Sequence, residues 1–288
     1  MIILENEKLR AVISPKGAEL QSLFNKETGI EYMWSGDAAY WSKHSPVLFP
    51  IVGSLKEDTY FYKDKTYHLP RHGFARERIF LKDQLGMEEA VFSLSQDAET
   101  LAVYPFAFLL KLRYRLQQNT LTCTYEVSNT GYDELLFSVG AHPAFAVPMV
   151  KDTDYTDYYL QFNAEEQLHR WKLQAGLIAD DAQLLPMQNN SLPLAHELFY
   201  EDAIVLKNMQ SNRITLGCTK HAHGINFHFD NFPFFGIWAA KNANFICLEP
   251  WCGIADSINH NQQLKNKEGI IMLTANNNWQ RNWMVECF

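Results

Sequence analysis

Two neighbouring runs of alternating apolar and polar residues constrain the fold of this chain more than any other feature. Residues 109–116 and residues 120–127 each alternate with a period of two, and three polar residues, 117–119, connect them. Such alternation is typical of strands that bury one face, and a short polar connection between two such runs predicts a β-hairpin. The pattern therefore predicts antiparallel β-structure in the middle of the chain.

Similar short runs recur along the whole sequence. They cover residues 9–14, 90–94, 158–162, 203–207, 213–218, 226–229, 235–239, 245–249 and 269–274. Many short strands separated by turns predict an all-β sandwich or barrel, with helix only in short pieces such as residues 38–43 and 256–259. No internal repeat and no Gly/Ser/Pro-rich linker divides the sequence, so we expect a single domain over residues 1–288.

Charge and cysteine content limit the partners and the compartment. The formal net charge is -8, whereas a nucleic acid or an anionic membrane would require a basic surface. No apolar stretch reaches the roughly 18 residues of a membrane span, and the first residues carry acids where a signal peptide has basic residues. The five cysteines lack the spacing of a disulfide or zinc framework. We therefore expect a cytoplasmic protein that binds neither nucleic acids nor membranes.

Three short segments each offer one side chain that can carry a proton. They are the sequences RHGFAR around His72, GAHPAF around His142 and LEPW around Glu249. Histidine exchanges protons near neutral pH, and burial raises the pKa of a glutamate towards the same range. Two imidazoles and one carboxylate beside Gly, Pro and aromatic residues are therefore candidates for general acid/base catalysis without a cofactor.

Each of these residues also has a simpler interpretation. His72 could be solvated in a surface loop, His142 could be an ordinary core histidine, and Glu249 could point to water from a strand edge. The glycine and phenylalanine after His72 favour a functional loop, and the neighbouring Trp251 favours a pocket around Glu249. Asp202 precedes an apolar run, where it fits a turn at least as well as a site for a polyol.

The sequence has one cluster of histidines, and a solvated turn explains it better than a metal centre does. His221 and His223 share one face of a possible strand, but His228 falls on the opposite face and no acid completes the set before Asp230. The sequence also lacks the phosphate loop, the dinucleotide fingerprint and the nucleophile elbow. We therefore expect neither a metal nor an organic cofactor.

Taken in order, the three segments resemble the aldose 1-epimerase (galactose mutarotase) family, in particular its LacX-like branch. The likeness begins at residues 4–20, continues through residues 48–53 and includes all three segments, so it covers nearly the whole chain. It implies a galactose mutarotase-like β-supersandwich, an antiparallel all-β fold of two large packed sheets. This agrees with the fold class that the strand pattern predicts.

The resemblance also implies a reaction, in which the ring of an aldose opens and recloses so that its α and β anomers interconvert without a cofactor. Glu249 would remove the proton of the C1 hydroxyl, His142 would protonate the ring oxygen, and His72 would hydrogen-bond the ring or C1 oxygen. Arg76 and Asp202 would bind sugar hydroxyls, and Trp238 would lie against the face of the sugar.

One part of this chain departs from the pattern of the family. Classical galactose mutarotases carry an Asn-Arg pair after the glycine that Gly53 resembles, whereas this chain continues with Ser54 and Leu55. The guanidinium that reaches the sugar is therefore missing unless Lys56 or Arg71 replaces it. The identity of the sugar, galactose included, stays open for this reason.

Three other functions remain open at the level of the sequence. A hexose-6-phosphate 1-epimerase needs a basic rim, for which Arg71, Arg76 and Arg78 are candidates. A non-catalytic carbohydrate-binding or regulatory protein needs no matched acid and base, and a glycosidase needs a second carboxylate facing Glu249. An epimerase should hold Glu249 and His142 on opposite sides of one monosaccharide-sized pocket. The expected partner is a small sugar, and the sequence allows a monomer or a homodimer.

Overall fold

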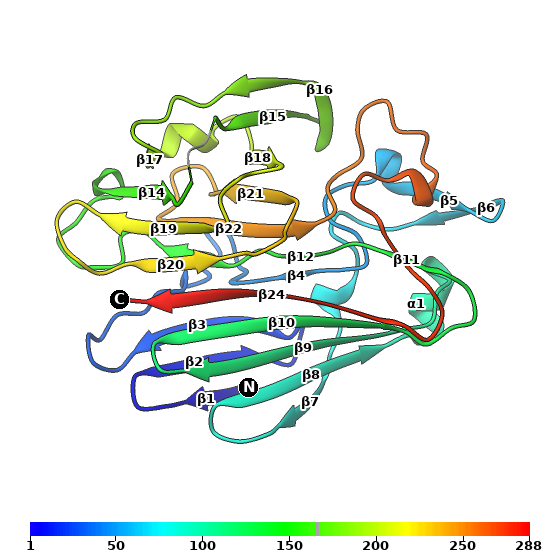
Figure 1. The fold of residues 1–288 in the computed structure, drawn as a ribbon, viewed down its shortest axis with the longest axis horizontal. Coiled ribbons are helices and arrows are strands. Elements are labelled where there is room, and N and C mark those ends of the chain that lie inside the picture. The colour runs from blue at the N-terminus through cyan, green and yellow to red at the C-terminus, as the bar shows by residue number, and fades with distance from the viewer. Residues whose placement is uncertain (165–166) are drawn as a thin grey trace.

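Antiparallel β-sheets make up most of the regular structure, and the two largest share one apolar core (Figure 1). The structure, a computed structural model, describes residues 1–164 and 167–288. The larger sheet has nine strands in the order β17 (Ser191–Pro193), β14 (Tyr158–Phe162), β19 (Arg213–Cys218), β20 (Ile225–His228), β24 (Asn278–Cys287), β10 (Thr120–Asn129), β9 (Phe108–Gln117), β8 (Glu89–Ser95) and β7 (Leu81–Gln84).

The second sheet has eight strands and carries the residues of greatest functional interest. Its order is β16 (Leu177–Leu184), β15 (His169–Gln174), β18 (Ile204–Lys207), β21 (Phe234–Trp238), β22 (Phe245–Cys252), β12 (Val139–Ala141) and β4 (Val47–Leu48), with β13 (Ala144–Ala146) paired to β22 beside this path. Every pair of neighbouring strands in the two large sheets is antiparallel. The predicted all-β, antiparallel fold class is thus confirmed.

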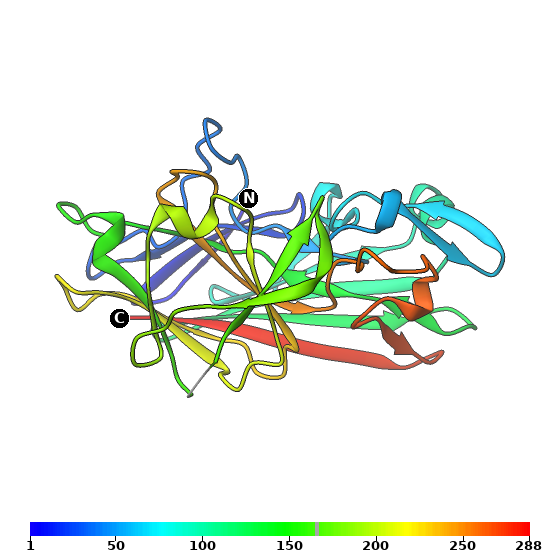
Figure 2. The ribbon, with the colours of Figure 1, turned by 90° about the horizontal axis from the view of Figure 1, so that it is seen from above.

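Smaller elements complete the molecule. A three-stranded sheet is formed by β1 (Ile2–Glu5), β2 (Leu9–Ser14) and β3 (Glu19–Asn25), and two strand pairs by β5 (Thr59–Tyr62) with β6 (Lys65–His68) and β11 (Leu135–Phe137) with β23 (Ile271–Leu273). The helical elements are α1 (Ala98–Val103) and the 3₁₀ turns η1 (Lys56–Asp58), η2 (Ala75–Glu77), η3 (Tyr155–Asp157), η4 (His196–Phe199) and η5 (Leu264–Asn266). From above, the N-terminal strands and β24 lie on opposite sides of the molecule, and the β5–β6 hairpin projects at one end (Figure 2).

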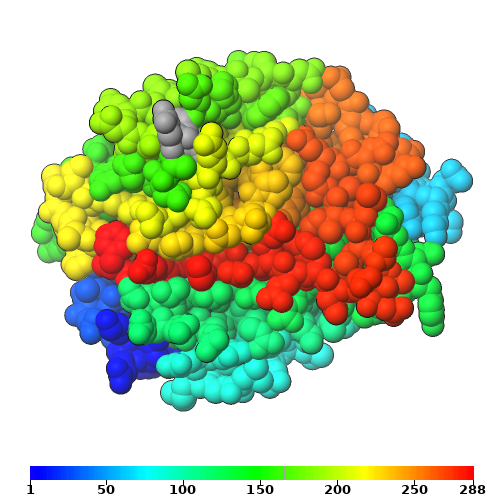
Figure 3. Space-filling model, viewed as in Figure 1, coloured from blue at the N-terminus to red at the C-terminus, as the bar shows by residue number. Residues whose placement is uncertain are grey.

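The predicted hairpin forms the centre of the nine-stranded sheet. Strands β9 and β10 pair antiparallel from Gln117 and Thr120 outwards, around a two-residue turn. In β9 every second residue is buried, from Phe108 to Leu116, and these residues face the core together with Leu121 and its alternate neighbours in β10. The C-terminal strand β24 lies against β10 and crosses the molecule as a continuous band (Figure 3).

The two predicted helices are wrong. Residues 38–40 form a turn in which a carboxylate oxygen of Asp37 accepts the amide N–H of Ala39, and residues 41–43 are irregular. Residues 256–259 are not helical because tertiary contacts fix them in another conformation. The carboxylate of Asp256 pairs with Lys267, and Ser257 forms an isolated β-bridge with Ile178. A helix of only a few residues is barely stable on its own, so contacts with the rest of the protein determine the conformation of both segments.

The strand predicted over residues 245–249 is longer in the structure, because β22 continues past Pro250 to Cys252. Along its edge, β22 pairs first with β13 and then with β12, and between these two pairings residues 248–250 lie opposite residues 141–143. A proline inside a sheet normally costs a hydrogen bond of the ladder. Here the ladder is already interrupted at that point, so the strand tolerates the missing N–H.

Within the described residues, no helix combines the length and apolar character needed to cross a membrane.

Burial in the core predicts which side-chain truncation lowers the free energy of unfolding most. Trp283 in β24 is 1 % exposed, stacks on Phe227 and donates its indole N–H to the hydroxyl of Tyr125 at 3.2 Å. Substitution Trp283→Ala should lower the free energy of unfolding by about 3–5 kcal/mol, measured by urea denaturation. Trp279→Ala, on the same strand but only half-buried, is the matched control; an equal loss in both variants would contradict this account of the core.

Candidate active site

One cavity of about 220 Å³ opens on the face of the eight-stranded sheet that is turned away from the main core. All seven side chains that the sequence predicts as site residues line it: Arg71, His72, Arg76, His142, Asp202, Trp238 and Glu249. They come from strands β21 and β22, from the segment between β12 and β13, from the loop before β18 and from residues 71–76. Chain folding thus brings the three predicted segments into one site.

Sheet register places His142 directly across from Glu249. Strand β22 pairs Trp251 with Gly140 on one side of the interruption and Cys247 with Ala144 on the other, and counting inwards from both pairs makes His142 the partner of Glu249. Their side chains meet, with Nε2 of His142 3.2 Å from Oε2 of Glu249. The expectation of an acid and a base on opposite sides of the pocket is therefore not met, because the two groups are in contact.

Burial controls the protonation of this pair. Glu249 is 2 % exposed and His142 is 9 % exposed. Desolvation raises the pKa of Glu249 well above its usual value, against the opposing charge of Arg71, and lowers the pKa of His142 to about 3, with Arg71 acting in the same direction. Although the contact has the geometry of an ion pair, both shifts favour a neutral carboxyl and a neutral imidazole. In that form the carboxyl of Glu249 carries the proton of the pair.

His72 is held by the backbone in an unusual conformation. Its φ is +69°, in the left-handed region that a non-glycine residue rarely adopts. The amide N–H of Gly53 donates to Nδ1 of the ring at 3.1 Å, while the amide N–H of His72 donates to the carbonyl of Gly53 at 2.9 Å. An imidazole nitrogen that accepts from a backbone amide carries no proton, so the neutral ring has its proton on Nε2.

Arg71 contacts the other ring nitrogen of His72: its Nε–H donates to Nε2 at 3.2 Å. Desolvation, followed by the charge of Arg71, lowers the pKa of His72 well below its usual value, so the ring is neutral. A neutral imidazole accepts through only one nitrogen, so the amide of Gly53 and the guanidinium of Arg71 compete for that role. When Nδ1 accepts, the N–H groups of His72 and Arg71 can both donate to a single acceptor in the cavity. An oxygen atom of a bound sugar is a suitable acceptor of this kind.

Arg71 and Arg76 form a positive side of the cavity. The Nη2 group of Arg76 donates to the carbonyl of Arg71 at 2.8 Å, and among the described residues neither guanidinium has a carboxylate within ion-pair distance. Glu77, the acid next to Arg76, instead forms ion pairs with Lys16 and Lys43.

Arg78, the third arginine considered for a basic rim, does not line the cavity. It pairs with Glu99 at 2.6 Å and with Asp97 at 3.6 Å. Lys56 is also absent from the cavity wall, so Arg71 is the one of the two candidates that is available to replace the guanidinium missing after Gly53.

Aromatic rings surround the histidine of the pair. Trp238 presents its edge to the His142 ring with centroids 5.7 Å apart, and Trp41 stacks on the same ring at 5.0 Å and 29°. Trp41 was missed at the sequence level, because its segment was predicted to be a helix and nothing in the local pattern marks it as a pocket residue. Trp251, beside Glu249, was noticed only as a neighbour, and it also lines the cavity.

Asp202 lies two residues before β18, in the loop that opens this strand. Its Oδ1 accepts the amide N–H of Ala203 at 2.7 Å, and Arg170 donates to its backbone carbonyl at 2.7 Å. These contacts fix the loop that carries the carboxylate. Asp202 is thus an acceptor on the wall of the cavity that also contains Glu249, and its charge contributes to the raised pKa of Glu249.

A buried ion pair supports the loop that holds His72. Nζ of Lys267 lies 2.9 Å from Oδ1 of Asp256, and both side chains are fully buried. The second oxygen, Oδ2, accepts the amide N–H of Lys56 at 3.0 Å and contacts His260 at 3.1 Å, and the amide of Asp256 donates to the carbonyl of Ser54. Asp256 therefore ties down residues 54–56, immediately after Gly53.

Space also restricts this loop. Gly53 has φ +74°, and a Cβ there would lie 2.5 Å from Ala255, so the position requires glycine on two independent grounds. Burial alone would raise the pKa of Asp256, but hydrogen bonding to His260 and the charge of Lys267 outweigh it and lower the pKa below its usual value. No local sequence pattern marks this network, because its members are ordinary polar residues of loops.

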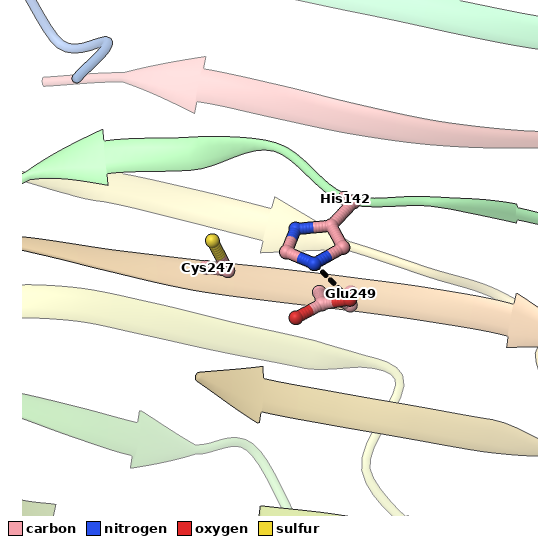
Figure 4. Close-up of side chains that lie close together, drawn as sticks. All are labelled: His142, Cys247 and Glu249. Atoms are coloured by element: carbon pink, nitrogen blue, oxygen red, sulfur yellow. Dashed lines mark ion pairs between the residues drawn. The ribbon is translucent and has the colours of Figure 1, made fainter. Parts of the chain in front are cut away.

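Residues able to hold a metal meet at one place within the described ranges. Ligand atoms of His142, Cys247 and Glu249 lie within 4.8 Å of one another, and all three residues are buried (Figure 4). The histidine cluster considered from the sequence does not form such a group: His221 contacts the hydroxyl of Tyr158 at 3.0 Å.

The fold is an antiparallel β-sandwich in which an acid and a base meet in one cavity, and the sequence comparison identifies the family. The model of the aldose 1-epimerase family matches residues 1–280, and the chain belongs to this family. The chromosomal and plasmid forms of Protein LacX from Lactococcus lactis subsp. lactis are each 34% identical to it over 277 residues, which is 92% of either chain.

Solved structures agree with this assignment. A galactose mutarotase related enzyme from Lactobacillus acidophilus superposes with a TM-score of 0.95 at 34% identity, covering 100% of this chain and 97% of the other. A galactose mutarotase-like protein from Lactobacillus casei ATCC 334 gives 0.94 at 34% identity, with 100% of both chains covered. These likenesses confirm the predicted galactose mutarotase-like fold.

The buried ion pair predicts a large difference between two lysines. Lys267→Met leaves the charge of Asp256 buried and unpaired, so it should lower the free energy of unfolding by about 3–5 kcal/mol in urea denaturation. The control is Lys63→Met, which breaks the exposed pair between Lys63 and Asp133 and should cost no more than about 1 kcal/mol. Similar losses in the two variants would contradict a structural role for the Lys267–Asp256 pair.

Proposed function

We propose that the protein is a cofactor-independent aldose 1-epimerase, an isomerase that interconverts the α and β anomers of a sugar. The observation that carries the proposal is the contact of 3.2 Å between His142 and Glu249 on the wall of a cavity of about 220 Å³. Membership of the aldose 1-epimerase family supports the same reaction type.

The pair can move protons in both directions without a net change of charge. In the reactive form Glu249 is a carboxylate and His142 an imidazolium. Glu249 takes the proton of the C1 hydroxyl while His142 gives its proton to the ring oxygen, and the C1–ring oxygen bond breaks to give the open-chain aldehyde. After rotation about the C1–C2 bond, the same two proton transfers run in reverse and close the ring on the other face.

Contact between the acid and the base is compatible with this reaction. The C1 hydroxyl and the ring oxygen of an aldose are bonded to the same carbon atom, so the groups that serve them have to lie close together. Burial favours the neutral carboxyl and the neutral imidazole, which is the form of the pair that follows ring opening. The free protein is thus preorganised for the proton distribution of the open-chain intermediate.

The remaining cavity residues have binding roles in this proposal. His72 and Arg71 donate to the ring or C1 oxygen and steady the charge that develops there. Arg76 and Asp202 bind hydroxyl groups on the rest of the sugar. Trp238, which sequence reasoning had proposed, and Trp41, which it missed, provide the apolar surface against which the sugar lies.

Removal of the base tests the proposal. Glu249→Gln keeps the shape of the side chain but cannot accept the proton, so kcat should fall by about 10²–10⁴-fold while sugar binding persists. The measurement is polarimetry on freshly dissolved α-anomers of glucose, galactose, xylose and arabinose. Glu88→Gln, at an exposed position, serves as the control with unchanged rates.

Two outcomes would decide against catalysis by the pair. An unchanged rate in Glu249→Gln would remove the glutamate from the mechanism. No acceleration by the wild type on any sugar, together with sugar binding by calorimetry, would identify a non-catalytic carbohydrate-binding protein instead. The glycosidase alternative has less support, because the direct partner of Glu249 is an imidazole and not a second carboxylate.

A hexose-6-phosphate 1-epimerase is the second candidate, favoured by one observation. Arg71 and Arg76 face the cavity and, among the described residues, have no carboxylate partner. Desolvation and the neighbouring charge of Arg71 lower the pKa of Arg76, which an anionic group on the substrate would offset.

This second candidate predicts a different substrate preference. The wild type should accelerate the mutarotation of glucose 6-phosphate more than that of glucose, and Arg76→Gln should reduce the preference by about tenfold or more, since a charge-assisted contact is worth about 1.5–3 kcal/mol. Arg78→Gln, outside the cavity, is the matched control. Equal rates on the two sugars would leave the neutral aldose as the substrate.

A further inference from the structure

Cys247 lies two residues before the proposed base, on the same face of strand β22. We propose that His142, Cys247 and Glu249 form a binding site for a thiophilic divalent cation, with Zn²⁺ as the preferred ion, which coordinates the acid and the base together and so excludes the reactive state. The proposed metal is an inhibitor of the site and has no part in the epimerase reaction.

The geometry comes from two neighbouring segments. Residues 247 and 249 of a strand project to the same side, and His142 reaches them from the segment opposite (Figure 4). The three ligand atoms lie within 4.8 Å of one another, with 3.2 Å between the imidazole nitrogen and the carboxylate oxygen. Since Zn²⁺ binds N, O and S ligands at about 2.0–2.3 Å, small side-chain adjustments bring all three to one ion.

The donor set selects the kind of metal. Imidazole, thiolate and carboxylate together suit Zn²⁺ and its heavier analogue Cd²⁺, whereas Mg²⁺ and Ca²⁺ prefer sites made of oxygen ligands. A thiolate and a carboxylate also balance the two charges of the ion, so the loaded site is neutral overall. That balance matters because all three residues are buried and an uncompensated charge would be costly.

Access and repulsion set limits to the site. His142 and Glu249 line the cavity, whereas Cys247 is fully buried and does not line it, so the ion would enter from the cavity. Arg71, Arg76 and Lys267 bring positive charge to this region and oppose a cation, whereas Asp202 favours one and His72 is neutral. We therefore expect weaker binding than at a structural zinc site.

Binding should release two protons. A cysteine binds the ion as the thiolate, so the thiol of Cys247 gives up its proton on coordination. The His142–Glu249 pair holds one further proton in either of its two forms. The ion displaces both, so Zn²⁺ loading releases the proton of the thiol and the proton of the pair into solution.

The test is titration of the whole protein with Zn²⁺, followed by calorimetry in buffers of different ionisation enthalpy. One ion and two released protons are expected, and Cys247→Ala should weaken binding by at least about tenfold. Cys252→Ala, on the same strand and outside the triad, is the matched control with unchanged affinity. Equal affinity in wild type and Cys247→Ala would overturn the proposal.

A spectroscopic measurement covers the case in which Cys247→Ala does not fold. Co²⁺ bound to the wild type should give a thiolate-to-metal charge-transfer band that Zn²⁺ abolishes, and a spectrum without that band would overturn the proposal. None of these readouts depends on epimerase activity. If the proposed function holds, Zn²⁺ should also inhibit mutarotation with a constant equal to its Kd; if it fails, the binding results stand alone.

Discussion

The contact between His142 and Glu249 is the interaction around which the site is organised. Both groups are withdrawn from water, and each on its own would be costly to ionise there. In the form that burial favours, with the proton on Glu249, neither group is charged, and the two side chains lie 3.2 Å apart. Neighbouring side chains of the cavity act on this pair: the charge of Arg71 favours the carboxylate, the charge of Asp202 opposes it, and Trp41 and Trp238 pack against the imidazole.

The β-sheet makes this contact possible through a local interruption of its ladder. Strand β22 exchanges one partner, β13, for another, β12, opposite Glu249, and a proline stands on each side of the gap, Pro143 and Pro250. In a continuous ladder the backbone of residue 142 would form regular hydrogen bonds with β22. The interruption instead leaves His142 outside the regular strand, while the flanking pairs still hold it in register. Rigid strands thus supply the precision that a flexible loop would lack.

The sequence predicted the antiparallel β-fold and seven of the residues that line the cavity, because both depend on patterns that are local or shared with a family. Alternation in residues 109–127 is visible over a few positions, and the motifs around His72, His142 and Glu249 are contiguous. What it missed depends on contacts between distant segments. Trp41 reaches His142 across about 100 residues of chain, the Asp256–Lys267 pair joins two loops, and Pro250 is tolerated only because of its partner strands. The single domain and the cytoplasmic compartment stay predictions.

All five cysteines are buried in the folded chain. A bulky thiol reagent in solution therefore has no target until part of the structure opens, and each cysteine reports on a different region. Cys123 and Cys287 lie in the paired strands β10 and β24 of the large sheet, whereas Cys247 and Cys252 lie in β22 behind the cavity. The order in which these thiols become labelled in the native protein is thus a map of which sheet separates first.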